Sequence, residues 1–336
     1  MSATLKDIAE YLGLSTSSVS RVLNNKGRIS EETRKKVFEA AEKFHYRPNE
    51  TARELKMQRS STVGVIIPDV ANTFYVKMLK SMDQMLWDAG YSIIFCDTNE
   101  NIEREKAYFE LLKSKKVSGM IIATTCKSDI YEKESKLGNY VFVDNAPYIT
   151  NKPYSFVSVD NERASYELTQ KIIEYGHRDI AMISGNLDES SSNDRVAGFK
   201  NCLSDYGIPF NPRRHYIGDC HYNSGYEITK KLIEHDNLPS IIYAHNNVEG
   251  FGAMYALKEE NIRIPEDVSL VCFDGQDDAK LIEPVFTGVS QPIERIGETA
   301  VQMIIDNLKN DGNHFKTVTN FLDYTFIEGR SLKKVN

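Results

Sequence analysis

The sequence predicts a small all-α head followed by a larger α/β core that contains two doubly wound parallel-sheet subdomains. Two patterns support this fold class. In residues 1–47, apolar side chains recur at helical spacing in three short segments. From Ser61 onward, short apolar segments alternate with helical patterns, which is typical of parallel strands covered by helices on both faces. The length of 336 residues fits two or three compact units at roughly 150 residues per domain.

The composition excludes several other classes of protein. With 41% hydrophobic and 26% charged residues, the chain is neither disordered, nor collagen-like, nor a small disulfide-stapled domain. No stretch approaches the roughly 20 apolar residues of a membrane span, and the opening MSATLKDIAE lacks a signal-peptide pattern. We therefore expect a cytoplasmic protein without membrane contact. The five cysteines are scattered without a CxxC pair, which favours reduced packing residues over disulfides or a zinc site.

Charge is divided unevenly along the chain. Residues 1–60 carry 12 Lys and Arg against 8 Asp and Glu, a balance of +4, whereas the remainder carries 29 against 40, a balance of −11. A basic head on an acidic body indicates that only the head meets a polyanion. Over 60 residues, such a charge difference can equally well arise by chance. The sequence pattern of the head therefore has to decide whether the head binds a polyanion.

Three helices are predicted in the head. Thr4 caps the first helix and Gly13 ends it, Ser15 caps the second, and the third begins at Ser30. A helix, a tight turn containing glycine and a second helix together form the supersecondary unit that reads DNA. The apolar positions expected to form one small core are Leu5, Ile8, Ala9, Leu12, Val19, Val22, Leu23, Val37, Ala40, Ala41 and Phe44.

The outward face of the second helix favours DNA contact. Its short hydroxyl side chains let a duplex come close, and Arg21, one turn further on, can bind a guanine with two hydrogen bonds. The polar, basic loop after this helix suits phosphate contact. The alternative is a helical interaction module with a serine-rich cap. The residues of the head expected to contact DNA are Ser15, Thr16, Ser17, Ser18, Ser20, Arg21, Asn24 and Arg28.

A conditional helix is predicted in the linker, residues 48–60. Pro48 interrupts the chain, Asn49 can cap the next segment, and that segment, residues 50–56, makes only about two turns. A helix this short does not persist alone in water, because nucleation is costly.

The head and linker resemble those of the LacI/GalR family of bacterial transcription regulators. The similarity is nearly gapless from Thr4 to Lys56 and includes S-R-V-L-N at 20–24, S-E-E-T-R at 30–34, Y-R-P-N at 46–49 and A-x-x-L at 52–55. In that family the linker folds on operator DNA, pairs with its twin in a homodimer and pushes a leucine into the minor groove. The resemblance implies that double-stranded operator DNA is the partner and that Leu55 is this leucine, with Asn49 and Ala52 beside it. Alternatively, Leu55 packs on the core.

In the core, residues 61–336, the alternation of strands and helices predicts two halves. The resemblance implies a periplasmic-binding-protein-like fold with a cleft between subdomains 61–160 plus 291–320 and 161–290 plus 321–336. Strands are expected at 62–68, 91–97, 118–124, 141–144, 179–185, 215–219, 240–245 and 268–274, and helices at 72–89, 103–114, 162–174, 196–203 and 224–234.

Ligands of open parallel sheets bind beyond the carboxyl ends of the strands. The residues there include carboxylates, amides and aromatic rings, which suit a polyhydroxyl ligand such as a sugar or a sugar derivative. The alternative is that these Asp and Asn residues only cap helices, above all Asp97 and Asp144. From the strand ends we select Asp69, Asn72, Phe74, Asp144, Ser184, Asn246 and Asp274.

The resemblance sharpens this set. Arg195 in D-R-V-A-G-F matches an arginine that grips effector hydroxyls, Asp274 and Asn246 match family positions, and Gln291 also fits. Two departures stand out. Asn247 replaces an aspartate, and Cys220 stands where sugar-binding members often place Trp or Phe, so His221 or Tyr222 would have to supply a ring. The effector is therefore expected to differ from the commonest hexoses.

No catalytic motif is found. The sequence lacks GxxxxGK[ST], a complete GxGxxG, HExxH and GxSxG, and its seven histidines are scattered. We therefore expect no enzyme and no cofactor, but a regulator of the repressor type whose operator affinity is controlled by a small polar, sugar-like ligand. The alternatives are a cytoplasmic sugar-capture protein on the same clamshell and an enzyme that uses the cleft.

Overall fold

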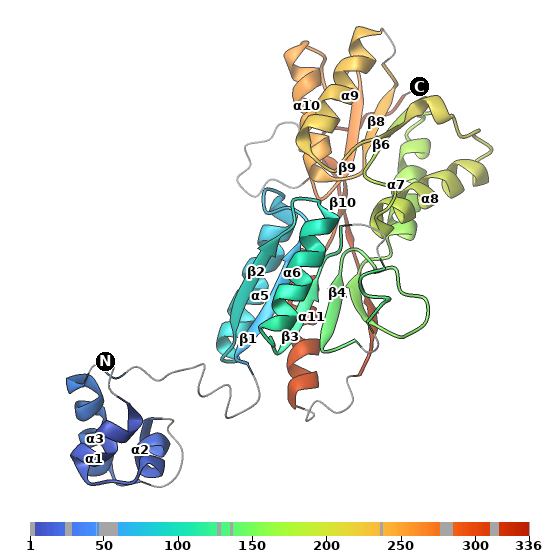
Figure 1. Cartoon of the computed structure of the whole chain (residues 1–336). Coiled ribbons are helices and arrows are strands. Elements are labelled where there is room, and N and C mark those ends of the chain that lie inside the picture. The colour runs from blue at the N-terminus through green and yellow to red at the C-terminus, as the bar shows by residue number, and fades with distance from the viewer. Residues whose placement is uncertain are drawn as a thin grey trace. The chain divides into compact units, whose positions relative to one another are not determined.

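The computed structural model describes residues 4–23, 29–44, 46, 60–125, 129–134, 137–235, 238–275, 285–309 and 316–335. The chain divides into two compact units, Met1–Ser60 and Ser61–Asn336 (Figure 1). Five residues predicted to contact DNA lie outside the described residues, so their predictions stay untested: Asn24, Arg28, Asn49, Ala52 and Leu55.

The head contains the three predicted helices, α1 (Leu5–Leu12), α2 (Thr16–Leu23) and α3 (Glu31–Lys43). At the start of α1, the Thr4 hydroxyl accepts a hydrogen bond from the Asp7 backbone and the Asp7 carboxylate accepts one from the Thr4 backbone. Gly13 ends α1 at φ +63°, a left-handed conformation that glycine adopts without strain. The buried side chains of all three helices form one core: Ile8, Ala9, Val19, Val22, Val37, Ala40 and Ala41.

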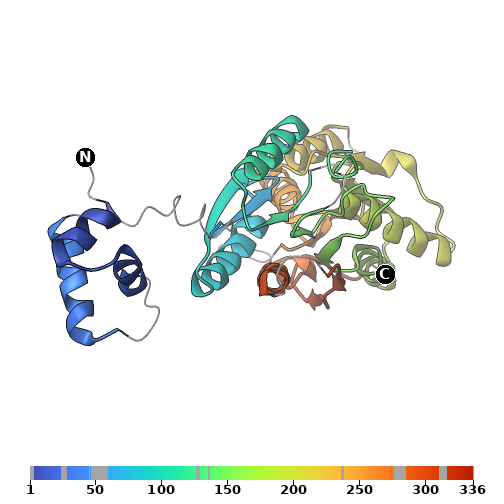
Figure 2. The ribbon, with the colours of Figure 1, turned by 60° about the horizontal axis from the view of Figure 1, so that its bottom comes forward.

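The first lobe of the core is built on a six-stranded, all-parallel sheet in the order β11-β5-β4-β3-β1-β2. Helices α5 and α11 cover one face and α6 covers the other (Figures 1 and 2). Alternate side chains of one strand therefore enter different cores, as with Val65 and Ile66. The elements of this lobe are β1 (Thr62–Ile67), α5 (Thr73–Asp88), β2 (Ser92–Asp97), α6 (Ile102–Ser114), β3 (Gly119–Ile122), β4 (Tyr140–Val143), β5 (Ser155–Ser158), α11 (Ile293–Lys309) and β11 (Thr319–Phe321).

The second lobe repeats this plan with the order β12-β10-β9-β8-β6-β7, in which the edge strand β12 runs antiparallel. Helices α7 and α8 pack on one face and α9 and α10 on the other. The elements are α7 (Asn161–Glu174), β6 (Ile180–Ser184), α8 (Ser190–Asp205), the 3₁₀ helix η1 (Pro212–Arg214), β7 (His215–Ile217), α9 (Tyr222–Glu234), β8 (Ile241–Ala244), α10 (Asn247–Glu259), β9 (Ser269–Phe273), β10 (Thr287–Ser290) and β12 (Thr325–Ile327).

The chain passes between the lobes three times: between β5 and α7, between β10 and α11, and between β11 and β12. The fold class expected from the sequence, a helical head and a core of two parallel-sheet subdomains, is therefore confirmed.

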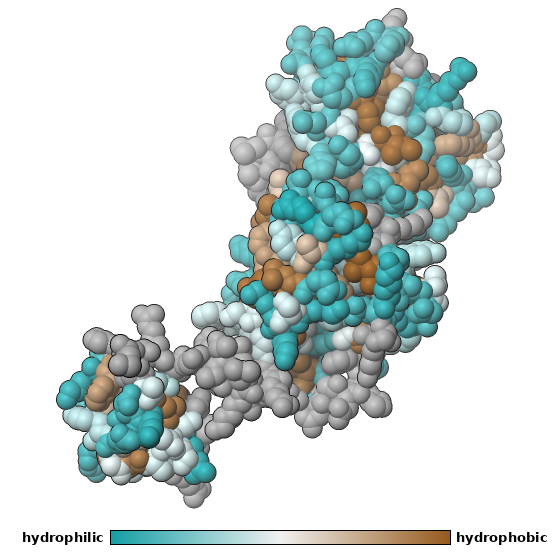
Figure 3. All heavy atoms as spheres, in the orientation of Figure 1, coloured by the Kyte–Doolittle hydropathy of each residue, from teal (hydrophilic) through white to brown (hydrophobic). Residues whose placement is uncertain are grey.

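The face of the core shown in Figure 3 is mainly polar. On the face shown in Figure 3, hydrophilic side chains cover most of the core and hydrophobic ones gather in small patches. Among the described residues, no helix is both long and apolar enough to span a bilayer.

Candidate functional site

The head presents a row of hydroxyl groups at the start of α2. The Ser15 hydroxyl accepts a hydrogen bond from the Ser18 backbone at 3.1 Å and lies 2.8 Å from the hydroxyls of both Ser17 and Ser18. Thr16, Ser17 and Arg21 are exposed, whereas Ser18 and Ser20 are half-buried. Because Val19 and Val22 are fully buried on the opposite side, the fold fixes which face of α2 can meet a partner.

The first lobe supplies one wall of the cleft in the core. Asn72 caps α5 and accepts a hydrogen bond from the Phe74 backbone at 3.0 Å. The next residue of the helix, Tyr75, donates its hydroxyl to Asp144, which follows β4, at 2.8 Å. Glu100, in the turn after β2, completes this wall. All of these residues follow the carboxyl ends of parallel strands, where ligands of such sheets bind.

Arg195 of α8 lies at the centre of the second lobe's wall. Its Nε donates to Asn161 Oδ1 at 2.8 Å and one terminal nitrogen donates to the His245 carbonyl at 2.7 Å. The guanidinium carbon lies 4.0 Å from the centre of the Phe273 ring, a cation–π contact. These three partners hold Arg195, which is 3% exposed, in one orientation.

Two further strand ends of the second lobe carry polar side chains. Asp274, after β9, accepts hydrogen bonds from the Gln291 backbone at 2.8 Å and from the Gln291 side-chain amide at 2.7 Å. Asn246, after β8, caps α10 by accepting from the Glu249 backbone at 2.8 Å. Asn246 and Asp274 therefore combine a capping or anchoring role with a place in the cleft wall.

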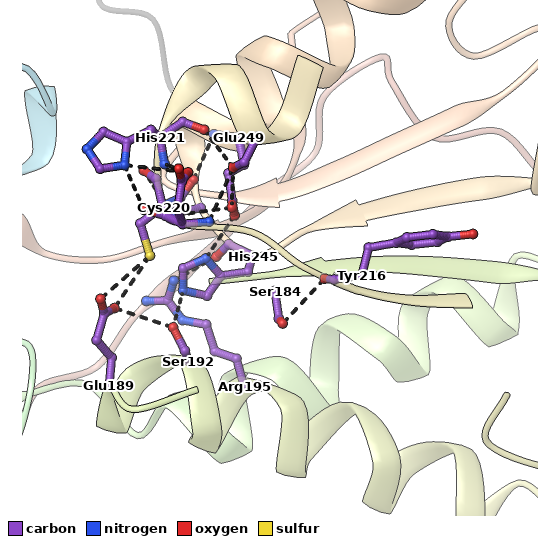
Figure 4. A network of polar contacts seen from close by, with 12 residues as sticks. Ser184, Glu189, Ser192, Arg195, Tyr216, Cys220, His221, His245 and Glu249 are labelled. Atoms are coloured by element: carbon purple, nitrogen blue, oxygen red, sulfur yellow. Dashed lines mark hydrogen bonds and ion pairs between the residues drawn. The ribbon is translucent and has the colours of Figure 1, made fainter. Parts of the chain in front are cut away.

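A buried polar network supports this wall (Figure 4). His245 lies between Ser192 and Glu249, with its ring nitrogens 3.0 Å from the serine hydroxyl and 3.3 Å from the carboxylate. Burial lowers the pKa of His245. The Cys220 thiol donates to Glu189 at 3.5 Å. Because Ser192 and Glu249 are fully buried, this network of hydrogen bonds holds His245 in a fixed position in the cleft wall.

The two lobes touch each other across the cleft. The Asn247 amide donates to Asn72 Oδ1 at 3.3 Å and to Thr73 Oγ1 at 3.2 Å. The Ala146 backbone donates to the Ser190 hydroxyl at 2.7 Å. The cavity left between the lobes is about 40 Å³, whereas small-molecule sites measure about 300–1,000 Å³. The lobes must therefore separate before a sugar-sized ligand can enter.

Acidic groups dominate the electrostatics of the cleft. Burial and the charge of Glu189 raise the pKa of Glu100 far above its ordinary range. Burial and the charge of Asp144 do the same for Glu189. Burial also raises the pKa of Asp144 and of Asp274, and Arg195 opposes both shifts.

Most of the predicted effector residues meet in this cleft, but three do not. Asp69 accepts from the Ala71 backbone beside the cleft. Ser184 lies beneath the surface and interacts with the His215 ring at 2.9 Å. Tyr222 is 39% exposed and its ring lies near Tyr255, so it supplies no aromatic wall. The predicted residues that line the cleft are Asn72, Phe74, Asp144, Arg195, Asn246, Asp274 and Gln291.

Several lining residues are absent from the set predicted by sequence. Cys220 and Asn247 stood out there only as departures from a family pattern. Glu189 precedes α8 in a serine-rich segment that gives no local signal, and His245 ends a strand. The one sequence signal that could have identified Glu100 is its position shortly after β2. Tyr75 follows the same strand as Phe74 but was not selected, and the missed lining residues are Glu100, Glu189, Ser191, Cys220, His245 and Asn247.

A helix-turn-helix head joined to a two-lobed core with a polar cleft is an architecture that suits a DNA-binding regulator. Residues 4–49 match the bacterial regulatory proteins of the lacI family, and residues 60–326 match the periplasmic binding proteins and sugar-binding domain of the LacI family. The chain belongs to the LacI family of transcription regulators. It is therefore a regulator and not an enzyme, and the head argues against the sugar-capture alternative.

Curated relatives and solved structures agree with this assignment. The chain is 34% identical to the transcriptional regulator RegA of Clostridium saccharobutylicum, with 91% of this chain and 92% of RegA covered. It is 30% identical to catabolite control protein A of Priestia megaterium, with 90% and 92% covered. The fold superposes on the lac repressor dimer bound to operator and the anti-inducer ONPF with a TM-score of 0.84, at 24% identity over 98% of this chain and 99% of that one.

Proposed function

We propose that this regulator represses transcription as a homodimer and that a sugar-like effector in the cleft sets its affinity for operator DNA. The observation that carries the proposal is the cleft itself. Both lobes supply polar strand-end groups to it, and direct contacts close it. A ligand that binds one lobe arrangement better than the other shifts the equilibrium between them.

In the head, we assign base contacts in the major groove to Thr16, Ser17 and Arg21. The support is their exposure on α2, opposite the buried valines. Arg21 can bind guanine with two hydrogen bonds, and short hydroxyls allow close approach. We assign contacts with the DNA backbone to the half-buried Ser18 and Ser20 and to Ser15 at the helix cap.

The proposed coupling runs through the linker. A change in the angle between the lobes alters the spacing of the two linkers of a dimer, and this decides whether their short helices can form. Leu55, with Asn49 and Ala52, would then enter the minor groove between half-sites. A coupling of about 1–3 kcal/mol changes operator affinity about 5- to 150-fold, which is enough for a switch.

Several observations support a polyhydroxyl effector. Asp144, Arg195, Asn246 and Asp274 offer charged and amide groups, and Phe74 supplies a ring beside them. One similar solved structure is the regulator CelR in complex with cellobiose, at 25% identity and a TM-score of 0.71, with 98% of this chain and 99% of that one covered.

A DNA-binding experiment tests the head. Gel shifts with genomic fragments are expected to yield sequence-dependent bands, and Arg21→Ala should weaken specific binding by about 1–3 kcal/mol while relaxing base preference. Arg263→Ala, which removes an exposed core arginine paired with Asp267, is the matched control. Equal retardation of all fragments would contradict sequence-specific recognition.

A ligand-binding experiment tests the cleft. A thermal-shift screen of neutral and amino sugars should raise the Tm of the wild-type protein for at least one sugar. The shift should disappear in Asp274→Ala, because Asp274 anchors Gln291 beside the ligand. A shift that persists unchanged in this variant would place the ligand elsewhere.

A further inference from the structure

We propose that the effector carries a protonated amine, as an amino sugar does, and that its ammonium group binds between Glu100 and Glu189. This inference rests on the proposed function, in which the cleft binds a small polyhydroxyl ligand, and it specifies the charge of that ligand.

The first argument is the charge of the described residues that line the cleft. Four carboxyl groups face one guanidinium there, and the imidazole of His245 is kept neutral by burial. Arg195 already donates to Asn161 and to the His245 carbonyl. The described residues supply no second cation for Glu100 and Glu189, so an ammonium group of the ligand can pair with them, whereas a neutral sugar leaves both groups protonated. The four carboxyl groups are those of Glu100, Asp144, Glu189 and Asp274.

The second argument comes from acceptors that lack donors. Gln291 is 5% exposed, and its Oε1 atom has no hydrogen-bond partner among the described residues. Likewise, no described residue donates a hydrogen bond to the Glu100 carboxyl group. Buried acceptors such as Gln291 Oε1 are normally satisfied, and the half-buried Glu100 is open to a donor, so the cleft suits a ligand that is rich in donors. An ammonium group supplies three donors and no acceptor.

A buried carboxylate elsewhere in the first lobe shows how the protein can supply hydrogen-bond donors from its own residues. Glu105 of α6 is fully buried and accepts four hydrogen bonds of 2.6–2.8 Å from Thr124, Thr125 and Tyr131. Among the described residues, Glu189 in contrast accepts only from a hydroxyl at 3.4 Å and a thiol at 3.5 Å. The fold satisfies Glu105 internally and leaves Glu100 and Glu189 for an external donor.

The electrostatic surroundings of Glu100 and Glu189 also favour the binding of an ammonium group. Burial raises the pKa of both Glu100 and Glu189, with the charge of Glu189 adding to the first shift and that of Asp144 to the second, so each holds a proton in the ligand-free cleft near neutral pH. An ammonium group can replace these protons and restore the ionised carboxylates. The other titratable groups that act on the pair are Asp69, Glu105, Asp144, Cys220 and Glu249.

The placement of the pair links amine binding to lobe closure. Glu100 follows β2 of the first lobe, and Glu189 precedes α8 of the second. The rings of Phe74 and Tyr75, with centroids 5.1 Å apart, line the same cavity, and aromatic faces attract ammonium groups. One ammonium group held by both carboxylates therefore ties the two lobes to each other in the ligand-bound arrangement.

Calorimetric titrations of the full-length protein with matched sugar pairs at pH 6.5 test the inference. The pairs are D-glucosamine with D-glucose, D-galactosamine with D-galactose and D-mannosamine with D-mannose. At least one amino sugar should bind about tenfold or more tightly than its neutral counterpart, because hydrogen bonds to charged groups are the stronger ones. Glu100→Gln and Glu189→Gln should each remove that preference. Glu103→Gln, an exposed position of α6, should retain it.

The outcomes separate this inference from the proposed function. A neutral sugar that binds as tightly as its amino counterpart, and whose binding is lost in Asp274→Ala, overturns the amine inference but supports the sugar effector. A preference for the amine that survives both glutamine substitutions also overturns the inference. If none of the six sugars binds, the amine inference is overturned, and the thermal-shift screen of other sugars decides whether the sugar effector stands.

Discussion

The head and the cleft present functional side chains in opposite ways. In the head, Thr16, Ser17 and Arg21 are the residues that a small core leaves on the surface. In the cleft, Asp144 and Arg195 are almost wholly buried and Asp274 is half-buried, and each is tied to a partner in the protein. The comparison teaches that, under the proposed function, the head would recognise DNA with exposed side chains on a helix face, whereas the core would recognise its ligand with side chains that its own folding orients.

The largest expected effect is on the head. Val19→Asp places an unpaired carboxylate in the core shared by α1, α2 and α3, where Val19 is fully buried. A cost of about 4 kcal/mol or more unfolds so small a unit. Operator binding should be lost in a gel shift, while the thermal transition of the core stays in place. Loss of both would show that the two units do not fold independently.

A smaller effect is expected from Arg195→Ala in the core. The change leaves Asn161 Oδ1 and the His245 carbonyl without their donor and should destabilise the core by about 2–4 kcal/mol. Calorimetry of the full chain should show a lower core transition with an unchanged head. Arg163→Ala, an exposed position paired with Glu167, is the control and should cost less than about 1 kcal/mol.

The third prediction concerns pH. The pKa of the Glu100 carboxyl rises from 4.5 to about 9 on folding, so its stabilising contribution is complete below pH 4.5 and is lost progressively up to about pH 9. Glu100→Gln stays neutral. Its Tm should exceed that of the wild type by a few degrees at pH 8.5 and by much less at pH 5.5. A Tm difference that does not change with pH would show that Glu100 is not a buried acid.

The smallest effect is expected at the contact between the lobes. Asn247→Asp replaces an amide donor by a carboxylate facing Asn72 Oδ1 and should weaken lobe closure by about 0.5–1.5 kcal/mol. Small-angle scattering of the ligand-free protein should then show a larger radius of gyration. Asn211→Asp is the control, because its Oδ1 only accepts a backbone hydrogen bond. An unchanged radius in both variants would mean that other contacts hold the lobes.

Much of the fold follows from local patterns. The caps at Thr4 and Ser30 and the glycine stop at Gly13 were predicted because each depends on residues a few positions apart. Helix α10 was not predicted, since Gly250 and Gly252 weaken its pattern. These glycines serve packing, because a Cβ at Gly252 would lie 2.2 Å from the Tyr222 carbonyl of α9. At Gly250 a Cβ would lie 3.2 Å from Cys272 of β9, so only the packed neighbours of α10 explain the two glycines.

The candidate site likewise combines features that the sequence predicts with features that only the tertiary structure reveals. By itself, the sequence determined that strand-end groups such as Asp144 and Asp274 lie at one edge of each sheet, because parallel strands carry their carboxyl ends to the same side. Tertiary structure alone decided that Glu100 and Glu189 face the same cavity from different lobes, and that Ser184 and Tyr222 do not reach it. The reason is physical: periodicity and caps arise from neighbours along the chain, whereas cavities and charge clusters arise from the way distant segments pack.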